Sequence, residues 1–264
     1  MSDLLVETPL GNIFARTWGG GGGRGAPIIL FHDSLGCVEL WRDFPEQLCT
    51  RTGRVVVAYD RLGFGRSDPH PGTLGPGFIR DEARTALPAL RAALGIDHMV
   101  LYGHSVGGAM AVCAAGAWPE ATEAIVTEAA QAFVEERTLA GVRAARTAMR
   151  APDHIRRLAR YHGQKAHWVL DAWTETWLSP AFRDWRLDDD LRAVRCPVLA
   201  LHGDRDEYGS LAFPERIGAL PPVATRVVIL EDCGHIPHRE QPGRVLEVTA
   251  RFLQGASRSR PPLP

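Results

Sequence analysis

The stretch "VLYGHSVGGAM", residues 100–110, places Ser105 where an apolar run ends and a helix-forming segment begins. Its central letters, GHSVG, match the pattern G-x-S-x-G, in which a tight strand-to-helix turn exposes a serine hydroxyl. Such a turn needs small neighbours, and Gly103, Gly107 and Gly108 supply them. A serine hydroxyl alone is unreactive, so the stretch also fits a glycine-rich structural corner. A nucleophile requires a base, an acid and an oxyanion hole elsewhere in the chain.

Composition narrows the class of protein. The 264 residues carry a formal net charge of −1, which gives no overall attraction to nucleic acid or to an anionic membrane. The N-terminal residues lack the basic and apolar regions of a signal peptide, and no stretch approaches the roughly 20 apolar residues of a membrane span. The cysteines are scattered without a C-x-x-C pair, which predicts free thiols in a cytoplasmic protein without a zinc site: Cys37, Cys49, Cys113, Cys196 and Cys233.

Apolar runs and helix-forming stretches alternate along the chain. The helix-forming stretches cover residues 38–51, 77–94, 106–117, 210–219 and 242–254. The last six apolar runs are continuous, as expected of parallel strands buried on both faces, and the first two read as an antiparallel edge hairpin. This pattern predicts a doubly wound, mostly parallel, eight-stranded α/β sheet. The runs are residues 4–8, 12–18, 27–32, 54–60, 98–104, 123–129, 197–203 and 226–232.

One segment breaks the alternation. Residues 131–190 contain no strand candidate, which predicts a helical cap inserted after the sixth strand. Residues 1–130 and 191–254 then form the core domain, and residues 255–264 are expected to be a disordered tail. The run "GGGGGRG" at 19–25 leads into a strand instead of a helix, so it predicts a flexible loop and no dinucleotide site.

His235 is the candidate base, because it lies in a loop between the last predicted strand and the last helix. His238, three residues later, reads as a surface or loop residue. The acid should follow the preceding strand, where "VLALHGDRDEYG" offers Asp204, Asp206 and Glu207. The resulting chain order of serine, acid and histidine is the order that α/β-hydrolases use. Glu128, at the end of the sixth strand, is a further candidate acid.

The oxyanion hole needs two backbone N–H groups. One is expected from Val106, directly after the nucleophile, and the other from Ser34 in "LFHDSLGC", with Leu35 as the alternative.

Five motifs together resemble those of the α/β-hydrolase superfamily, across essentially residues 4–254. "FHDSLG" is similar to its H-G-x-x-G loop, with Asp33 in place of a glycine, and "YDRLGFGRSD" is similar to a structural segment. "GHSVGG" resembles the serine turn, "HGDRD" the G-x-x-D acid turn and "GHIPHREQP" the histidine loop. The resemblance implies the hydrolase fold with Ser105, Asp206 and His235 as its catalytic residues. It says little about the substrate.

The serine excludes the family branches that attack with aspartate, namely haloalkane dehalogenases and epoxide hydrolases. The GHSVG sequence also differs from the G-G-S-W-G that proline iminopeptidases carry. Acyl transfer to water remains, from a carboxylic ester, a lactone or a thioester, with no metal or organic cofactor. Two alternatives stay open: a carbon–carbon bond hydrolase, which commonly has tryptophan where Ile236 stands, and a perhydrolase, which usually has methionine where Val106 stands. A non-catalytic ligand-binding protein of the same fold is the alternative of a different class.

The cap is expected to select a small acyl substrate. Trp168, Trp173 and Trp177 follow helical spacing, and they either pack the cap on the sheet or form an aromatic wall around the substrate. Between residues 137 and 165 only Asp153 opposes a group of bases, which predicts either a solvated face or a binding surface for an anionic substrate. The bases are Arg137, Arg143, Arg146, Arg150, Arg156, Arg157, Arg160 and Lys165.

Overall fold

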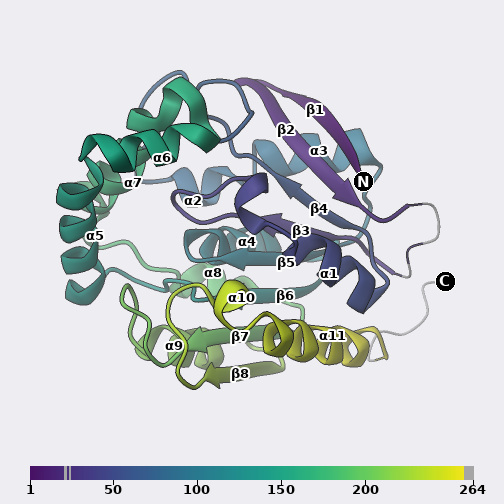
Figure 1. The fold of residues 1–264 in the computed structure, drawn as a ribbon. Coiled ribbons are helices and arrows are strands. Elements are labelled where there is room, and N and C mark those ends of the chain that lie inside the picture. Colours follow the sequence, from purple (N-terminus) through teal and green to yellow (C-terminus); the bar gives the residue numbers. More distant parts are fainter. Residues whose placement is uncertain (21–22, 24, 259–264) are drawn as a thin grey trace.

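The computed structural model describes residues 1–20, 23 and 25–258. Eight strands form one sheet in the order β1-β2-β4-β3-β5-β6-β7-β8 (Figure 1). Strands β3 to β8 are parallel to one another, whereas β1 and β2 form an antiparallel hairpin at the edge, next to β4. The predicted eight-stranded, mostly parallel sheet is confirmed. The strands are β1 (Ser2–Thr8), β2 (Gly11–Trp18), β3 (Ile28–Phe31), β4 (Val56–Tyr59), β5 (Met99–His104), β6 (Thr122–Glu128), β7 (Val198–Gly203) and β8 (Thr225–Leu230).

Helices cover both faces of the sheet, because successive side chains of a strand point to opposite faces. Leu101 of β5 belongs to the apolar cluster under α4, whereas its neighbours Val100 and Tyr102 belong to the cluster under α1 and α11. One face carries α1 (Phe44–Thr52) and α11 (Pro242–Arg258), which contact each other, together with η1 (Val38–Trp41) and α10 (Pro237–Glu240). The other face carries α2 (Phe78–Asp81), α3 (Ala86–Leu94), α4 (Val106–Ala117), α8 (Asp188–Ala193) and α9 (Ala212–Ala219).

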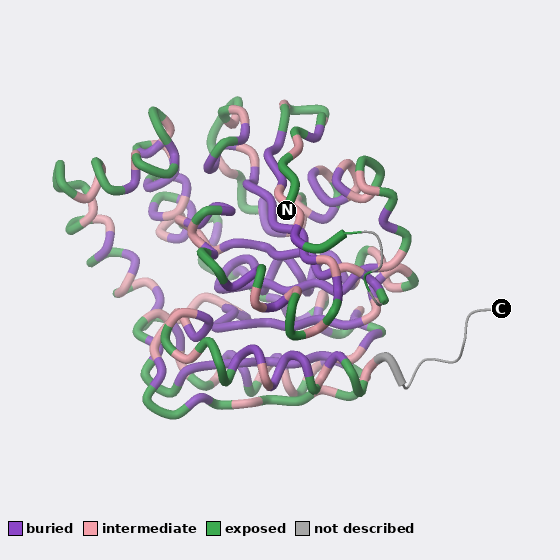
Figure 2. Tube along the Cα trace, turned by 45° about the vertical axis from the view of Figure 1, so that its right-hand side comes forward, coloured by how far each residue is buried: buried purple, intermediate pink, exposed green. Residues whose placement is uncertain are grey.

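The sequence predicts that β8 is buried on both faces, and this prediction is wrong. Val227 and Ile229 are 38% and 39% exposed, whereas every residue of β3, β4, β5 and β7 is buried. Figure 2 shows the buried strands in the middle of the molecule. The reason is position, because β8 is an edge strand with β7 as its one partner. A continuous apolar run therefore did not distinguish this edge strand from a central one.

Between β6 and β7 the chain forms a separate helical layer, at the upper left of Figure 1. It consists of α5 (Glu136–Met149), α6 (Pro152–His162), η2 (Gly163–Lys165), α7 (Ala166–Trp177) and η3 (Pro180–Phe182). The layer has its own small apolar cluster, in which Leu158 and Val169 pack with Phe64 from the loop after β4. The cap boundary drawn at residue 190 falls inside α8, which packs against α4 of the core.

Residues 255–258 are helical, whereas a disordered tail was predicted from residue 255. Helix α11 continues to Arg258, and Ala256 packs against the apolar cluster that α11 shares with α1. This contact stabilises the extra turn. Residues 259–264 lie outside the described residues, as do residues 21, 22 and 24 of the glycine-rich run.

Candidate active site

Ser105 occupies the turn between β5 and α4 with φ +57° and ψ −126°, a backbone conformation that is strained for a residue with a side chain. Its N–H donates a hydrogen bond to the carbonyl of Glu128, 2.8 Å away. The neighbouring glycines are required by close contacts: a Cβ on Gly103 would lie 2.0 Å from the carbonyl oxygen of Gly107, and a Cβ on Gly107 would lie 2.1 Å from that of Phe31. The turn therefore holds the serine in a fixed position above the sheet.

The structure brings Ser105, His235 and Asp206 into one hydrogen-bonded chain. His235 Nε2 lies 3.0 Å from Ser105 Oγ, and His235 Nδ1 lies 2.8 and 2.9 Å from the two carboxylate oxygens of Asp206. An ionised carboxylate at Nδ1 fixes the proton there and leaves Nε2 free to accept the serine proton. This is the geometry of a serine nucleophile with its base and acid.

Asp206 is completely buried, and its surroundings favour the ionised form. Burial by itself would raise the pKa of this carboxyl, but the hydrogen bond from His235, the nearby His202 and the backbone N–H of Tyr208 outweigh burial and lower the pKa. Gly209 N–H donates to the same oxygen as Tyr208, at 3.0 Å. Asp204, the alternative in this turn, is exposed and accepts from Cys233 N–H instead.

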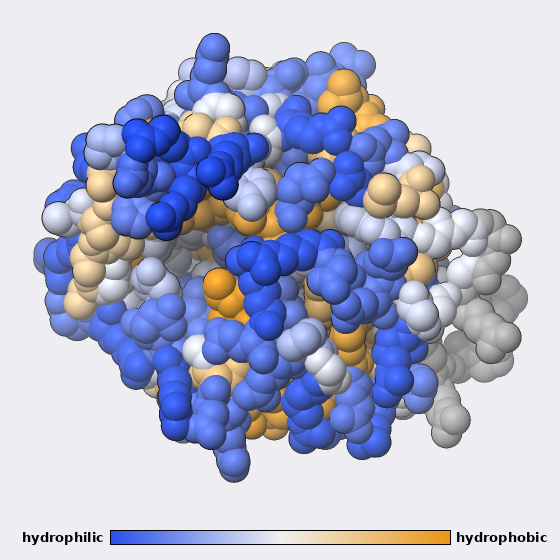
Figure 3. Space-filling view, in the orientation of Figure 1, coloured by the Kyte–Doolittle hydropathy of each residue, from blue (hydrophilic) through white to orange (hydrophobic). Residues whose placement is uncertain are grey.

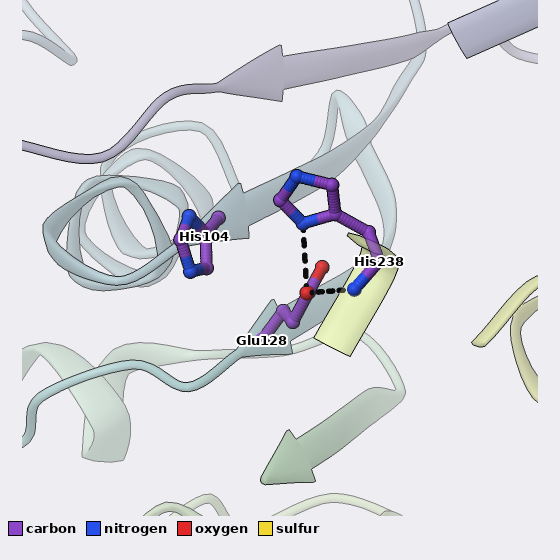
Figure 4. A group of neighbouring side chains, drawn as sticks. All are labelled: His104, Glu128 and His238. Carbon is purple, nitrogen blue, oxygen red and sulfur yellow. Dashed lines mark hydrogen bonds and ion pairs between the residues drawn. The ribbon is translucent and has the colours of Figure 1, made fainter. Parts of the chain in front are cut away.

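Glu128, the other candidate acid, forms a second carboxylate–histidine pair (Figure 4). Its Oε1 accepts from the backbone N–H of His238 at 2.7 Å and faces His238 Nδ1 at 2.9 Å, while the Tyr102 hydroxyl donates to Oε2. His238, read from the sequence as a surface residue, is only 5% exposed because α10 carries it onto the aromatic rings of Trp41 and Phe44.

His104, Glu128 and His238 place three potential ligand atoms within 4.8 Å of one another. Metal binding would compete with existing hydrogen bonds, because both carboxylate oxygens of Glu128 already accept from protein donors. Burial raises the pKa of a carboxyl, yet the two histidines and Tyr102 lower the pKa of Glu128 to about 2. The group is thus an internally bonded network around a buried carboxylate.

The loop after β3 contains the candidate oxyanion donor. Leu35 N–H donates to Oδ1 of Asp33 at 2.8 Å, so this amide already has a protein partner. Ser34 and Ser105 both line the same cavity, and Val106 begins α4. Use of the Ser34 and Val106 amides as the oxyanion hole stays a prediction.

A cavity of about 230 Å³ opens above Ser105. Its apolar wall is formed by Leu35, Leu40, Val142, Trp173, Trp177 and Ile236. In Figure 3, apolar surface is visible between the hydrophilic outer face of the helical layer and the core. The cap therefore contributes side chains directly to the space where a substrate would meet the serine.

Two of the three candidate tryptophans line this cavity, and the third does not. Trp173 and Trp177 are four residues apart in α7, about 40° around the helix axis, whereas Trp168 is turned by about 140° from Trp173. Trp168 instead stacks on His70, donates its indole N–H to Gly72 O, and lines a larger cavity of about 510 Å³ that contains neither Ser105 nor His235. Trp168, predicted for the substrate pocket, therefore does not line the cavity above Ser105.

Sequence reasoning missed two residues of this site. Gln131 is 4% exposed, and its side-chain amide lies within 3.2 and 3.4 Å of Ser105 Oγ. The Tyr208 ring packs at a tilt against that of His235, with ring centroids 5.0 Å apart. The available signal was weak: Gln131 is a polar residue in the apolar segment directly after β6, and Tyr208 follows the candidate acid by two positions.

The basic residues of the cap have acidic neighbours that the window from 137 to 165 left out. Arg150 lies 2.9 Å from Asp171 and 3.2 Å from Glu175, and Arg146 lies 3.6 Å from Glu175. Arg143 pairs with Glu136. Helix α7 thus supplies carboxylates to the arginines of α5, which reduces the positive potential that the sequence window implied.

Comparison with known proteins places the chain in a family. The model of the alpha/beta hydrolase family matches residues 28–248, and the chain belongs to this family. A (lyso)-N-acylphosphatidylethanolamine lipase of Bos taurus is 33% identical over 100 residues, 38% of this chain and 29% of the lipase. The 1-acylglycerol-3-phosphate O-acyltransferase ABHD5 of Homo sapiens is 32% identical over 114 residues, 43% of this chain and 32% of that protein. The matched segments thus span less than a third of these relatives.

Solved structures share the fold over nearly the whole chain. A membrane phospholipase A, described as a bacterial virulence factor, has a TM-score of 0.78 at 22% identity and covers 98% of this chain and 87% of its own. A thermophilic esterase from Thermogutta terrifontis has a TM-score of 0.72 at 23% identity, with 97% and 99% covered. At such identities the likeness concerns the fold.

Two further observations bear on the cellular setting. All five cysteines are free, as their scattered positions predict. Across residues 1–20, 23 and 25–258, none of the helices has the length and apolar character needed to cross a membrane. The cytoplasmic location remains a prediction.

Proposed function

We propose that this protein is a serine hydrolase that cleaves a carboxylic ester through an acyl-enzyme intermediate. The observation that carries the proposal is the continuous chain from Ser105 Oγ through His235 to Asp206, with the serine opening into a cavity. A decayed, purely ligand-binding member of the fold would have no need to keep all three groups within hydrogen-bond distance.

The mechanism follows from the positions of the groups. Ser105 Oγ attacks the ester carbonyl carbon while His235 Nε2 takes the serine proton, and Asp206 stabilises the imidazolium that forms. The amides of Val106 and Ser34 stabilise the negative charge on the carbonyl oxygen. His235 then protonates the departing alcohol. In the second half, a water molecule gives its proton to His235 and attacks the acyl carbon. The bond to Ser105 Oγ then breaks, His235 returns the proton to this oxygen, and the acid is released.

The size and lining of the cavity favour a small, apolar acyl group. Its volume of about 230 Å³ is below the roughly 300–1,000 Å³ of pockets for drug-sized ligands. Trp173 and Trp177 close it from the cap. Lactones and thioesters present the same carbonyl chemistry to Ser105, so the choice among these bonds rests on measurement.

A labelling experiment tests the proposal. The purified chain is treated with a fluorophosphonate, and the modified peptide is identified by mass spectrometry. We expect one phosphonylated residue, Ser105, and turnover of p-nitrophenyl acetate and butyrate. A chain that neither reacts with the probe nor hydrolyses esters, lactones or thioesters would be a ligand-binding member of the family instead.

A further inference from the structure

His104, the residue before the nucleophile, lies in the middle of the candidate machinery. Its side chain is 1% exposed, and its Nε2 lies 2.7 Å from the backbone carbonyl oxygen of His235. Its Nδ1 lies 3.4 Å from Oδ2 of Asp33, an ion-pair distance outside good hydrogen-bond geometry. One ring thus connects the serine turn, the loop of the base and the loop of the oxyanion donor.

Asp33 makes this contact important, because this acidic residue lines the cavity above the nucleophile together with Ser34 and Ser105. A negative charge at this place opposes the negative charge that develops on the substrate oxygen during attack. Something must therefore neutralise Asp33 if the oxyanion hole is to work.

The surroundings of His104 favour the charged form of its ring. Burial lowers the pKa of this imidazole, but the carboxylates of Asp33 and Glu128 and the carbonyl of His235 outweigh burial and raise the pKa to about 9. The other titratable groups that face it are His235 and His238, with ring centroids 5.2 and 5.1 Å away. Burial lowers the pKa of His238, which leaves that neighbour neutral.

We propose that His104 is a positioning residue that acts as a permanent imidazolium: it neutralises Asp33 beside the oxyanion hole and holds the loop of the base through the carbonyl of His235. The inference rests on the proposed serine hydrolase function. As a cation, His104 carries a proton on both nitrogens, so it keeps the hydrogen bond from Nε2 to the carbonyl of His235 and presents positive charge to Asp33, 3.4 Å from Nδ1. A neutral ring could keep the hydrogen bond but would lose the charge that faces Asp33.

Charge-changing variants separate this positioning from simple space filling. His104→Gln keeps an amide donor and removes the charge, while Asp33→Asn keeps the shape of the carboxyl and removes its charge. We expect His104→Gln to lower kcat for p-nitrophenyl acetate about 10- to 100-fold with little change in KM, the size of one charged hydrogen bond. Adding Asp33→Asn to His104→Gln should recover kcat several-fold, because the uncompensated carboxylate is gone. His98→Gln, just before the opposite end of β5, is the matched control and should leave kcat unchanged.

The pH profile gives the second measurement. Wild-type kcat should fall as pH rises past about 9, where His104 loses its proton. In Asp33→Asn this alkaline limb should move down by about one pH unit and become shallower, because His104 loses a neighbouring negative charge and no longer has a carboxylate to neutralise. This variant carries the test even if His104→Gln fails to fold, which circular dichroism would reveal. An alkaline limb in Asp33→Asn with the wild-type position and depth, or wild-type kcat in a folded His104→Gln, would overturn the inference.

NMR titration of the histidine rings separates this inference from the proposed function. The His104 signal, assigned by its absence from His104→Gln, should titrate near pH 9 in the wild type and lower in Asp33→Asn. This reading requires no turnover. A wild-type chain that resists the fluorophosphonate would end the hydrolase proposal, whereas a His104 ring that is neutral at pH 7 would end the positioning proposal alone.

Discussion

Two carboxylate–histidine pairs lie side by side at the ends of neighbouring strands. Asp206 follows β7 and binds His235, and Glu128 ends β6 and binds His238, with nearly the same separation between Nδ1 and oxygen. His235 presents its other nitrogen to Ser105, beside an open cavity. His238 is enclosed by Trp41, Phe44 and His104. The two pairs have the same chemical groups. They differ in the surroundings of the part of the imidazole ring that does not face the carboxylate.

The comparison shows why a carboxylate–histidine pair alone does not define a catalytic acid and base. A base must reach the proton that it removes, and His235 alone of the two histidines lies within hydrogen-bond distance of Ser105. The pair of Glu128 connects β6 to α10 and so stabilises the loop that carries His235. Under the proposed function, the Asp206–His235 pair takes part in the reaction and the Glu128–His238 pair holds the first pair in place.

The largest expected effect comes from removing the nucleophile that distinguishes the two pairs. Ser105→Ala should lower kcat on activated esters by on the order of 10⁶, because the three groups act as a unit. Steady-state assays with p-nitrophenyl butyrate measure this loss, and circular dichroism confirms that the variant folds. Retention of most turnover would exclude the serine mechanism.

Isosteric amides then compare the two acids directly. Asp206→Asn should lower kcat by about 10⁴ near neutral pH, because the imidazole loses both its fixed tautomer and its stabilising charge. Glu128→Gln and Asp204→Asn should lower kcat far less. A severe loss in either of these two, together with an active Asp206→Asn, would reassign the acid and leave Ser105 and His235 in place.

Stability at low pH should reveal the buried pair instead. The pKa of Glu128 is about 2 in the folded chain, against an ordinary value of 4.5. Between these two pH values the folded state therefore binds fewer protons than the unfolded state. The stability that this ionised group contributes is complete above pH 4.5 and is lost as pH falls toward 2, on the order of 3 kcal/mol. Denaturant unfolding of wild type and Glu128→Gln across this range measures it. If the free energy of unfolding changes with pH in the same way in the two proteins, the lowered pKa of Glu128 would be contradicted.

The cap should show a smaller, selective effect. Trp173→Ala enlarges the cavity above Ser105, so kcat/KM for longer p-nitrophenyl esters should rise relative to the acetate, by about tenfold. Trp168→Ala is the matched control, because this ring lies outside the cavity. An equal shift in both variants would mean that the cap acts through general loosening.

The smallest effect is expected for salt. Because Arg146 and Arg150 face carboxylates of α7, acidic and neutral esters should respond to added salt to a similar extent. A comparison of kcat/KM at low and high ionic strength measures the difference. A steep loss confined to acidic esters would restore the arginines as an anion-binding surface.

Local sequence patterns predicted most of the fold and the three side chains of Ser105, Asp206 and His235 that the structure brings together. Glycine spacing around Ser105 and the positions of Asp206 and His235 after their strands depend on short-range geometry, which parallel strands bring to one edge of the sheet. The structure departs from the predictions where tertiary packing determines the outcome. The cases are the exposure of β8, the last turn of α11 with Ala256, and the orientation of Trp168. The spacing of apolar residues does not show which other element a helix or strand will pack against.

The sequence by itself determined the sheet, the strained serine turn and the order of serine, acid and histidine, because each follows from a short run of residues and the rules of strand and turn geometry. Tertiary structure alone decided that Glu128 binds His238, that Gln131 reaches Ser105, and that His104 lies between Asp33 and the carbonyl of His235. The partners in these contacts are separated by 26 to 131 positions in the sequence. Their contacts depend on how strands and loops pack together, and a local sequence pattern does not determine contacts between residues so far apart in the chain.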